Sequence, residues 1–546
     1  MLPDIPVFAF PKKCRKRLQS TARLWYESVV AKLSRRTFSA SLLSAPLLLR
    51  GQSTSSASRV KIDTERTIGQ IDPKLYGNFI EHLGRCIEGG VFEEGSSLSD
   101  AQGFRKDVME AVRNLDVGLL RWPGGNFSSN YNWRDGIGPR DKRPKRLEMA
   151  WHTIEDNRFG THEFLTYTGM LGIEPYICAN LGTGDWVEAQ RWVEYCNFAG
   201  DTATTRMRKA NGREEPWKVK YWGLGNEMDG PWQMGHRTAE DYGKFALEAA
   251  KLMKWTDPDI KLIAAGSSNF NPRADWTGWN RTVLEYLKEH VDYLSLHTYV
   301  GNPHNDYDEF LTSSIELADR IETAAGIIRA ALAGAPPNRR IYIAFDEWNV
   351  WYRARGAAKE SGRNILEEHY NLEDALVVAT MLNTFVNHAN VVKIANLAQL
   401  VNVIAPIFTN ETGLYLQTIY YPLQLFAANS HGTALELFVD CPTYTSKAPG
   451  NVPYIDASAT LQDGTLVVNV VNRHRDQDVD VAIELEDKQF SGSYQVATVN
   501  GPDIKAENNF GVTKVKSSPG SVETNGKMLH YRFPAHSYTM LKGKIA

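Results

Sequence analysis

Two kinds of hydrophobic pattern alternate along most of the chain. Short runs of apolar and β-branched residues, typical of buried strands, are separated by longer segments whose apolar residues recur at helical spacing. The short runs occupy residues 75–80, 118–122, 174–179, 219–224, 260–265, 291–296, 340–345 and 391–397. Strand and helix alternating in this way predict an α/β fold, a parallel sheet closed into a (β/α)8 TIM barrel.

The pattern changes near residue 430. Short segments of alternating apolar and polar residues follow one another, separated by Gly, Asn and Asp, as in an antiparallel β-sandwich. These segments are 465–471, 479–485 and 494–499. We therefore expect an N-terminal strand at 59–70 that joins the sandwich, a barrel at 71–428 and a C-terminal β-sandwich at 429–546.

The first 58 residues differ from the rest in charge. They contain ten Lys and Arg but only Asp4 and Glu27, which gives this segment a charge of +8; the whole chain carries −3, so the remainder carries −11. Arg35 and Arg36 precede an apolar stretch at 38–49 that is too short to span a membrane, and a tract of small residues follows. This order predicts a twin-arginine export leader and a periplasmic or extracellular mature protein.

Composition narrows the class of protein. A hydrophobic fraction of 42% and a charged fraction of 23% are ordinary for a soluble globular chain. The acidic body argues against a nucleic-acid partner, because phosphate binding needs clustered positive charge. The five cysteines, Cys14, Cys86, Cys178, Cys196 and Cys441, show no metal-ligand spacing. We expect buried free thiols, no metal site and no cofactor.

Polar side chains gather where the predicted barrel strands end, the face of such a barrel that carries chemistry. Among them Glu227 and Glu347 stand out, because each carboxylate lies beside an amide side chain in a Trp-rich setting. They follow the fourth and seventh predicted strands, which face each other across a barrel mouth. The others are Asn78, Glu81, His82, Arg121, Asn126, Asn226, His297, Tyr299, Asp346, Asn396 and Gln399.

Paired carboxylates of this kind suit the cleavage of a glycosidic bond. One carboxyl group protonates the leaving oxygen, and the second attacks the anomeric carbon or activates water. An acid that keeps its proton near neutral pH needs burial or a negative neighbour, and ionised Glu347 would provide that neighbour for Glu227. We therefore expect Glu227 to be the acid/base and Glu347 the nucleophile.

Other interpretations apply to single residues. Either Glu alone could be a solvated surface residue, and Glu81 could form a structural ion pair with His82 or Arg121. His297 could be a buried histidine with its hydrogen bonds satisfied. Arg121 is expected to orient a carboxylate rather than to contact substrate.

Long motifs at these positions resemble glycoside hydrolase family 51, the α-L-arabinofuranosidases. They include Arg-Trp-Pro-Gly-Gly-Asn at 121–126, Gly-Asn-Glu-Met-Asp-Gly-Pro-Trp at 225–232, Ser-Leu-His-Thr-Tyr at 295–299 and Phe-Asp-Glu-Trp-Asn at 345–349. Further motifs lie at 76–87, 180–184 and 398–404, so the match is collinear over roughly residues 60–546.

The resemblance implies a retaining enzyme that removes terminal α-L-arabinofuranosyl residues, without a cofactor and often as a hexamer. Its acid/base and nucleophile fall on Glu227 and Glu347. Its sugar contacts fall on Glu81, Asn126, Asn226, Tyr299 and Gln399, and its aromatic walls on Trp151 and Trp351. The expected substrates are arabinan, arabinoxylan or their oligosaccharides.

Two other functions stay open at this point. A different retaining glycosidase, a β-xylosidase or an endo-glucanase, could use the same two carboxylates in a different pocket. A non-catalytic carbohydrate-binding protein could keep the fold, although both carboxylates are present. Many members of the family are cytoplasmic, so an export leader would be a departure from it.

Overall fold

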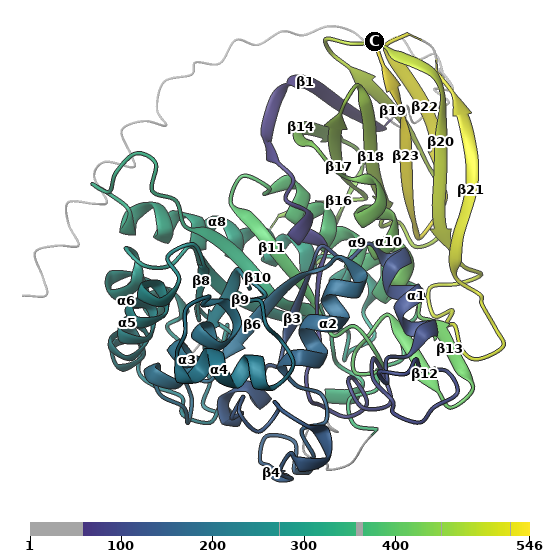
Figure 1. Cartoon of the computed structure of the whole chain (residues 1–546). Helices are drawn as coiled ribbons and strands as arrows, with labels where there is room; N and C mark the ends of the chain where they lie inside the picture. Colours follow the sequence, from purple (N-terminus) through teal and green to yellow (C-terminus); the bar gives the residue numbers. More distant parts are fainter. Residues whose placement is uncertain (1–57, 272–273, 356–363, 449, 525) are drawn as a thin grey trace, which may run out of the picture. The chain divides into compact units, whose positions relative to one another are not determined.

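A computed structural model describes residues 58–546, apart from 272–273, 356–363, 449 and 525 (Figure 1). The predicted leader at 1–58 lies outside the described residues except for Ser58, where the first strand begins. Within the described part of the chain, no helix is both long and apolar enough to cross a membrane.

Eight parallel strands close into a barrel, as the hydrophobic pattern predicts. Around the barrel their order is β10, β11, β2, β3, β6, β7, β8 and β9, with β9 returning to β10. Their bounds are β2 Gly77–Phe79, β3 Leu119–Trp122, β6 Glu174–Ala179, β7 Tyr221–Leu224, β8 Lys261–Ala264, β9 Tyr293–Val300, β10 Tyr342–Val350 and β11 Val392–Ala398. Each overlaps one of the predicted strands, so the barrel prediction is confirmed.

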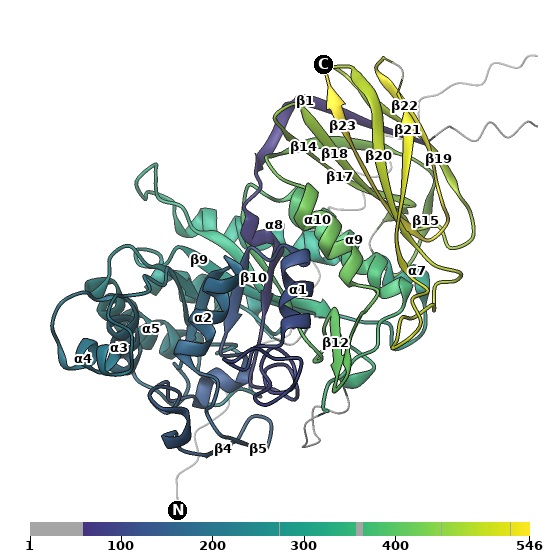
Figure 2. The same ribbon diagram turned by 45° about the vertical axis from the view of Figure 1, so that its right-hand side comes forward.

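Helices surround the barrel (Figures 1 and 2). Most bury one apolar side; in α1, for example, Val108, Val112 and Leu115 recur at helical spacing and face the core. The α-helices are α1 Lys106–Leu115, α2 Thr161–Leu171, α3 Trp186–Asn197, α4 Ala203–Ala210, α5 Ala239–Thr256, α6 Trp276–Leu287, α7 Tyr307–Phe310, α8 Ser313–Ala331, α9 Leu372–Asn387 and α10 Tyr420–Asn429. The 3-10 turns are η1 Pro73–Tyr76, η2 Asn126–Asn130 and η3 Arg140–Lys142.

The C-terminal region is a sheet structure with its own core, which confirms the predicted β-sandwich. Strand β1, Ser58–Gln70, lies inside this sheet between β14 and β19, so it joins the two ends of the described chain. The sheet runs in the order β21, β20, β23, β18, β17, β14, β1, β19 and β22. Its other strands are β14 Thr433–Asp440, β17 Ile455–Gln462, β18 Thr465–Asn472, β19 Val479–Leu485, β20 Phe490–Asn500, β21 Lys516–Glu523, β22 Met528–Phe533 and β23 Ser537–Ile545.

The sheet structure packs against the barrel through α9 and α10. Tyr538 of β23 stacks on Phe426 of α10, with ring centroids 5.3 Å apart. The Tyr76 hydroxyl donates to the Ser430 carbonyl at 2.5 Å, which links the start of the barrel to the end of α10. Both regions therefore share one continuous apolar core around these helices.

In the described part of the chain, three short two-stranded sheets lie outside the barrel and the large sheet. They pair β4 Arg146–Glu148 with β5 Thr153–Glu155, β12 Ile407–Asn410 with β13 Gly413–Leu416, and β15 Thr443–Thr445 with β16 Asn451–Pro453. The four cysteines in the described residues are free thiols; Cys86, Cys178 and Cys196 are buried and Cys441 is half-buried.

Candidate active site

Two carboxylates meet at the mouth of the barrel. Glu227 follows β7 and Glu347 lies in β10, and an oxygen of each, with a ring nitrogen of His297, lies within 4.8 Å of the others. Carboxyl groups about 5–5.5 Å apart suit a retaining glycosidase, whereas inverting enzymes separate theirs by about 6.5–9.5 Å. The chain thus folds so that the two glutamates are close enough for double displacement.

The backbone at Glu227 makes a sharp turn. Gly225 has φ of +82° and Glu227 has φ of +44°, a left-handed conformation that is rare for a residue with a side chain. Such strain persists only where the surrounding structure imposes it, and it is common at functional sites. Here the turn directs the carboxylate toward His297 and Glu347 rather than toward solvent.

Glu347 is held by a cation and a phenol. The Arg121 guanidinium donates to Oε1 at 2.6 Å, and the Tyr299 hydroxyl donates to Oε2 at 2.8 Å. Only 7% of the Glu347 side chain is exposed. Burial, and then the negative charge of Glu347, hold the pKa of Tyr299 well above its ordinary value, so the phenol stays a donor. These contacts fix the position of the carboxylate.

Glu227 has different partners. The Trp232 indole donates to Oε2 at 2.5 Å, and Nδ1 of His297 lies 2.9 Å from Oε1. Trp232 is half exposed, so this contact sits at the rim of the site. Sequence reasoning assigned no role to Trp232, although it belongs to the motif that contains Glu227.

His297 connects both carboxylates to a third acid. Its Nδ1 lies near Glu227 and Glu347, and its Nε2 lies 3.3 Å from Asp346. Burial alone lowers the pKa of His297, but the charge of Glu347 and the bonds to Asp346 and Glu227 raise it well above its ordinary value. The imidazole is therefore a charged donor to the acids around it, and it is a buried histidine with both nitrogens used.

Asp346, which contacts His297 and Arg121, is itself held by two hydroxyl groups. It accepts from the Tyr176 hydroxyl at 2.7 Å and from the Ser295 hydroxyl. Burial raises the pKa of its carboxyl, but Arg121 and His297 outweigh burial and lower it to about 2. Neither Tyr176 nor Ser295 was singled out from the sequence; both occupy inward positions of barrel strands, which is the only signal they carry.

Arg121 also orients an amide. Its second nitrogen donates to Oδ1 of Asn226 at 2.5 Å, which leaves the Asn226 side-chain nitrogen aimed elsewhere. That nitrogen is buried and has no hydrogen-bond partner among the described residues. Because buried donors are normally paired, it is available for a hydroxyl of a bound sugar.

Glu81 lies in a second polar cluster beside the pair. It accepts from the Phe127 backbone at 2.9 Å, from the Trp151 indole at 3.1 Å and from Gln399 at 3.3 Å. Burial, more than the nearby charge of Glu347, raises the pKa of Glu81 to about 8. It pairs with neither His82, which binds Glu155, nor Arg121. Those structural ion pairs are therefore not formed.

A glycine allows the backbone to approach this cluster closely. A side chain at Gly125 would place its Cβ 2.8 Å from Oε2 of Glu81, so the backbone can approach the acid only without one. Asn126 follows at the start of η2, and its side chain forms no hydrogen bond within the described part of the chain. Its amide is thus free for a ligand.

Aromatic side chains border the two clusters. The Trp351 ring meets Tyr299 edge to face, with centroids 5.3 Å apart, and its indole nitrogen is buried without a partner among the described residues. Trp151 is buried, and its indole nitrogen donates to Glu81.

Of the side chains that the sequence suggested, the structure brings a first group together with the two glutamates, namely Arg121, Asn226, His297, Tyr299 and Asp346. It brings Gln399 and Trp151 to Glu81, and Trp351 to Tyr299, whereas His82 binds Glu155 instead.

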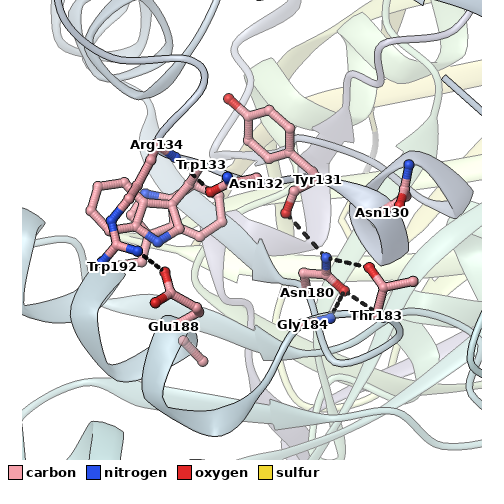
Figure 3. A pocket seen from close by; sticks show the side chains of 11 residues that line it. Asn130, Tyr131, Asn132, Trp133, Arg134, Asn180, Thr183, Gly184, Glu188 and Trp192 are labelled. Atoms are coloured by element: carbon pink, nitrogen blue, oxygen red, sulfur yellow. Dashed lines mark hydrogen bonds and ion pairs between the residues drawn. The ribbon is translucent and has the colours of Figure 1, made fainter. Parts of the chain in front are cut away.

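A separate cavity of about 220 Å³ lies behind the loop that follows β6 (Figure 3). Trp133 and Trp192 form one side of it and Asn180 the other. The Asn180 side chain accepts from the backbone of Thr183 and donates to the Tyr131 carbonyl. Its tryptophan rings are almost fully buried, whereas the Tyr131 hydroxyl and the Trp133 indole nitrogen have no hydrogen-bond partner among the described residues. Neither Glu227 nor Glu347 lines this cavity, so it is separate from the carboxylate pair.

Family models match most of the chain. The α-L-arabinofuranosidase 1 domain matches residues 111–314, and the α-L-arabinofuranosidase C-terminal domain matches residues 346–537. The chain belongs to glycoside hydrolase family 51, the α-L-arabinofuranosidases. It carries the barrel, the paired glutamates and the accessory sheet region of a glycoside hydrolase.

Relatives match over nearly the whole length. The intracellular exo-α-(1→5)-L-arabinofuranosidase 1 of Bacillus subtilis is 42% identical over 488 residues, covering 87% of this chain and 97% of its own. The intracellular exo-α-(1→5)-L-arabinofuranosidase of Halalkalibacterium halodurans is 43% identical, covering 79% and 87%. The crystal structure of the Thermotoga maritima α-L-arabinofuranosidase arabinose complex has a TM-score of 0.81 at 38% identity, covering 89% and 100%.

These relatives overturn one prediction. Export to the periplasm or beyond was expected from the twin arginine, but the two bacterial relatives named above are called intracellular. The prediction of export is therefore wrong. The motif behind this prediction is short. In a segment rich in basic and apolar residues, two adjacent arginines before a short apolar stretch arise easily by chance.

Proposed function

We propose that the protein removes terminal, non-reducing α-L-arabinofuranosyl residues by double displacement, with Glu347 as nucleophile and Glu227 as acid/base. The observation that carries this proposal is the approach of the two carboxylates to within 4.8 Å, each with a different set of partners. That separation leaves room for the anomeric carbon on one side and the leaving oxygen on the other, but not for a water between them.

The partners support these roles. The Arg121 guanidinium donates to Glu347, a contact that suits a carboxylate acting as a nucleophile. Among the described residues the hydrogen-bond partners of Glu227 are Trp232 and His297, with no arginine. In the first step Glu227 protonates the glycosidic oxygen while Glu347 bonds to the anomeric carbon, and the rest of the substrate leaves as an alcohol.

The second step reverses these roles. Once Glu347 is esterified its charge is lost, and Glu227, now a carboxylate, takes a proton from water as that water attacks the anomeric carbon. Arabinose leaves with its configuration retained, and Glu347 returns to its bonds with Arg121 and Tyr299. His297 holds Glu227 in place through both steps.

Sugar recognition falls to the second cluster. Glu81, whose pKa is raised to about 8, is protonated at neutral pH and can donate from Oε2 to a hydroxyl while Phe127 and Trp151 hold its other oxygen. The unpaired amides of Asn126 and Asn226 supply further bonds. Trp151, Tyr299 and Trp351 border the ring. Hydrogen bonds of this kind favour one arrangement of hydroxyls strongly, because the wrong sugar leaves buried groups unpaired.

Arabinan, arabinoxylan and their oligosaccharides are the proposed substrates. The exo-α-(1→5) activity in the names of the two bacterial relatives supports arabinose-containing chains. A β-xylosidase or an endo-glucanase would use the same carboxylate pair, but the relatives favour the arabinofuranosidase.

We also propose that the enzyme is a homo-oligomer, a hexamer by resemblance to the family. The β4–β5 hairpin supports self-association, because Leu147 and Ile154 face each other across it and are 69% and 72% exposed. A paired apolar surface of this kind marks an interaction site. Sedimentation velocity of the wild type and of Leu147→Lys tests it; a monomeric wild type contradicts it.

The decisive experiment compares two chromogenic substrates. We expect the wild type to release p-nitrophenol from the α-L-arabinofuranoside far faster than from the β-D-xylopyranoside, and Glu347→Ala to release it from neither. A well-folded wild type that cleaves only the xyloside would keep the carboxylate pair and overturn the substrate.

A further inference from the structure

A surface groove outside the candidate active site lies between the first turns of α3 and α5. These helices pack side by side (Figures 1 and 2), and the groove between them is wide open to solvent, with a volume of about 710 Å³. It is lined by two aromatic rings and several polar side chains, among them Trp186, His236, Arg237, Asp241 and Phe245.

The floor of the groove is aromatic. Trp186 is 37% exposed, and its ring meets that of Phe245 at a centroid distance of 5.3 Å. The Arg237 guanidinium lies over the other side of this pair, 4.2 Å from the centroid of Phe245. Partly exposed rings rimmed by polar groups mark a ligand groove, and a flat ring offers a packing surface for the C–H face of a sugar.

The Arg237 guanidinium has N–H groups that are not used in hydrogen bonds. Its Nε is buried without a hydrogen-bond partner, and the side chain forms no ion pair with any described residue. The two acids that follow it in the chain have other partners: Glu240 pairs with Lys244, and Asp241 accepts from the Thr238 hydroxyl. A planar guanidinium with unused N–H groups beside an aromatic floor can bind neighbouring hydroxyls of a sugar ring.

A compact loop connects Glu227 to Arg237 of the groove. The Gly230 amide donates to the Glu227 carbonyl at 2.8 Å, and the Arg237 amide returns to the Met228 carbonyl at 3.0 Å. Arg237 is thus folded back beside the residue that follows Glu227. Trp232, half exposed and bonded to Glu227, lies within the same loop.

The groove also opens on the correct face of the barrel. Helices that follow barrel strands begin where those strands end, which is the face with the catalytic mouth. Trp186 is the first residue of α3, and Phe245 lies in the second turn of α5. A chain that leaves the mouth past Trp232 would therefore reach this groove without crossing to another side of the molecule.

We propose that this groove binds a sugar residue of the polysaccharide main chain whose arabinofuranosyl branch or end occupies the active site. The proposal rests on the proposed function and adds a second contact, remote from the bond that is cleaved. A small aryl glycoside cannot reach it, whereas a soluble polymer can hold both contacts at once.

Kinetics on small and large substrates test the groove. For Trp186→Ala and for Phe245→Ala we expect KM on soluble arabinan or arabinoxylan to rise about five- to tenfold, the loss of one aromatic contact, with kcat nearly unchanged. Values of kcat/KM on p-nitrophenyl α-L-arabinofuranoside should stay at the wild-type level. The matched control is Trp255→Ala, which removes a 76% exposed tryptophan from the last turn of the same α5.

A binding measurement separates this proposal from the proposed function. In the Glu347→Ala background, which should leave the polymer intact, native gels containing arabinan or arabinoxylan should retard the protein, and Trp186→Ala should weaken that retardation so that about five- to tenfold more polymer is needed for the same effect. The two gels tell which main chain is bound. Unchanged KM and unchanged retardation in Trp186→Ala, or equal losses in Trp255→Ala, would overturn the groove even if the enzyme is an arabinofuranosidase.

Discussion

At the end of the barrel where its strands begin, the interior is filled by Leu119, Tyr221, Ile263, Tyr293 and Ile394, which form a separate apolar cluster. At the end where the strands finish, the interior is filled by Arg121, Glu227, His297, Asp346 and Glu347. The interior of the same barrel is thus apolar at one end and charged at the other.

One residue reaches both ends. The Tyr176 ring belongs to the apolar cluster, while its hydroxyl donates to Asp346 at 2.7 Å. The apolar end stabilises by removing surface from water. The charged end needs every partner in place, because a buried charge without one is costly. Substitutions at the apolar end should therefore lower stability and leave catalysis unchanged, whereas those at the charged end should lower catalysis and, where they leave a charge unpaired, stability as well.

The largest effect should come from the carboxylate pair. We expect Glu347→Ala to lose about 10⁴-fold or more in kcat/KM on every substrate, because no covalent intermediate can form. Glu227→Ala should lose least on aryl glycosides, whose leaving groups need little protonation. Steady-state kinetics on p-nitrophenyl arabinofuranoside and on an arabino-oligosaccharide check this. Equal losses on both substrates would remove Glu227 from its role.

Breaking the charged network should affect both properties. Arg121→Met removes the guanidinium that pairs with Glu347 and Asp346 and leaves only His297 as a cation beside them. We expect a loss of about 3–5 kcal/mol in the free energy of unfolding together with most of the activity. Chemical denaturation and p-nitrophenol release measure the two losses. A variant as stable as wild type would mean that the acids take up protons or rearrange at little cost.

The dependence of stability on pH should reveal Glu81. Its pKa rises from 4.5 to about 8 on folding, so the folded state binds the proton more tightly. The stability this gives is complete below pH 4.5 and is lost as pH rises through 8, by roughly 1.4 kcal/mol per pH unit within that window.

Glu81→Gln isolates this contribution. The variant should show a shallower decline of Tm between pH 5 and 8 than wild type does, even though Asp374, whose pKa is raised to about 7, contributes a decline of the same sign in both proteins. Thermal melts at closely spaced pH values make the comparison. Parallel curves would show that Glu81 is ionised in the folded protein.

The smallest effect belongs to the apolar end. Ile263→Val removes one buried methylene from that cluster, and we expect a loss of about 1 kcal/mol in the free energy of unfolding with kcat/KM unchanged. Denaturant midpoints and kinetics on the aryl arabinofuranoside decide it. A change in kcat of the same order would mean that packing at this end sets the geometry of the mouth.

The same contrast explains what sequence could reveal. All eight barrel strands follow from runs of apolar residues, and the polar residues at their ends, Glu227 and Glu347 among them, follow from the rule that strand ends carry chemistry. The partners of those residues depend on distances across the barrel. Tyr176 and Ser295 look like ordinary strand residues, and Trp232 could have been any surface tryptophan.

Short local motifs predicted less reliably than hydrophobic periodicity repeated along the chain. The twin arginine and the apolar stretch after it satisfy a short motif, yet the expected export is contradicted by relatives named intracellular. The barrel prediction rested on repeated periodicity over hundreds of residues, whereas the leader rested on a few positions. The pairing of β1 with both β14 and β19 likewise needed the structure, because a single strand does not specify its neighbours.

The most direct test of double displacement is the configuration of the product formed with azide. Glu227→Ala should be rescued by azide and yield the α-L-arabinofuranosyl azide, because azide attacks the intermediate on Glu347. Glu347→Ala should yield only the β-anomer, by direct attack on the substrate. Proton NMR distinguishes the anomers. A β-azide from Glu227→Ala would contradict a covalent intermediate on Glu347 and with it the assignment of the two carboxylates.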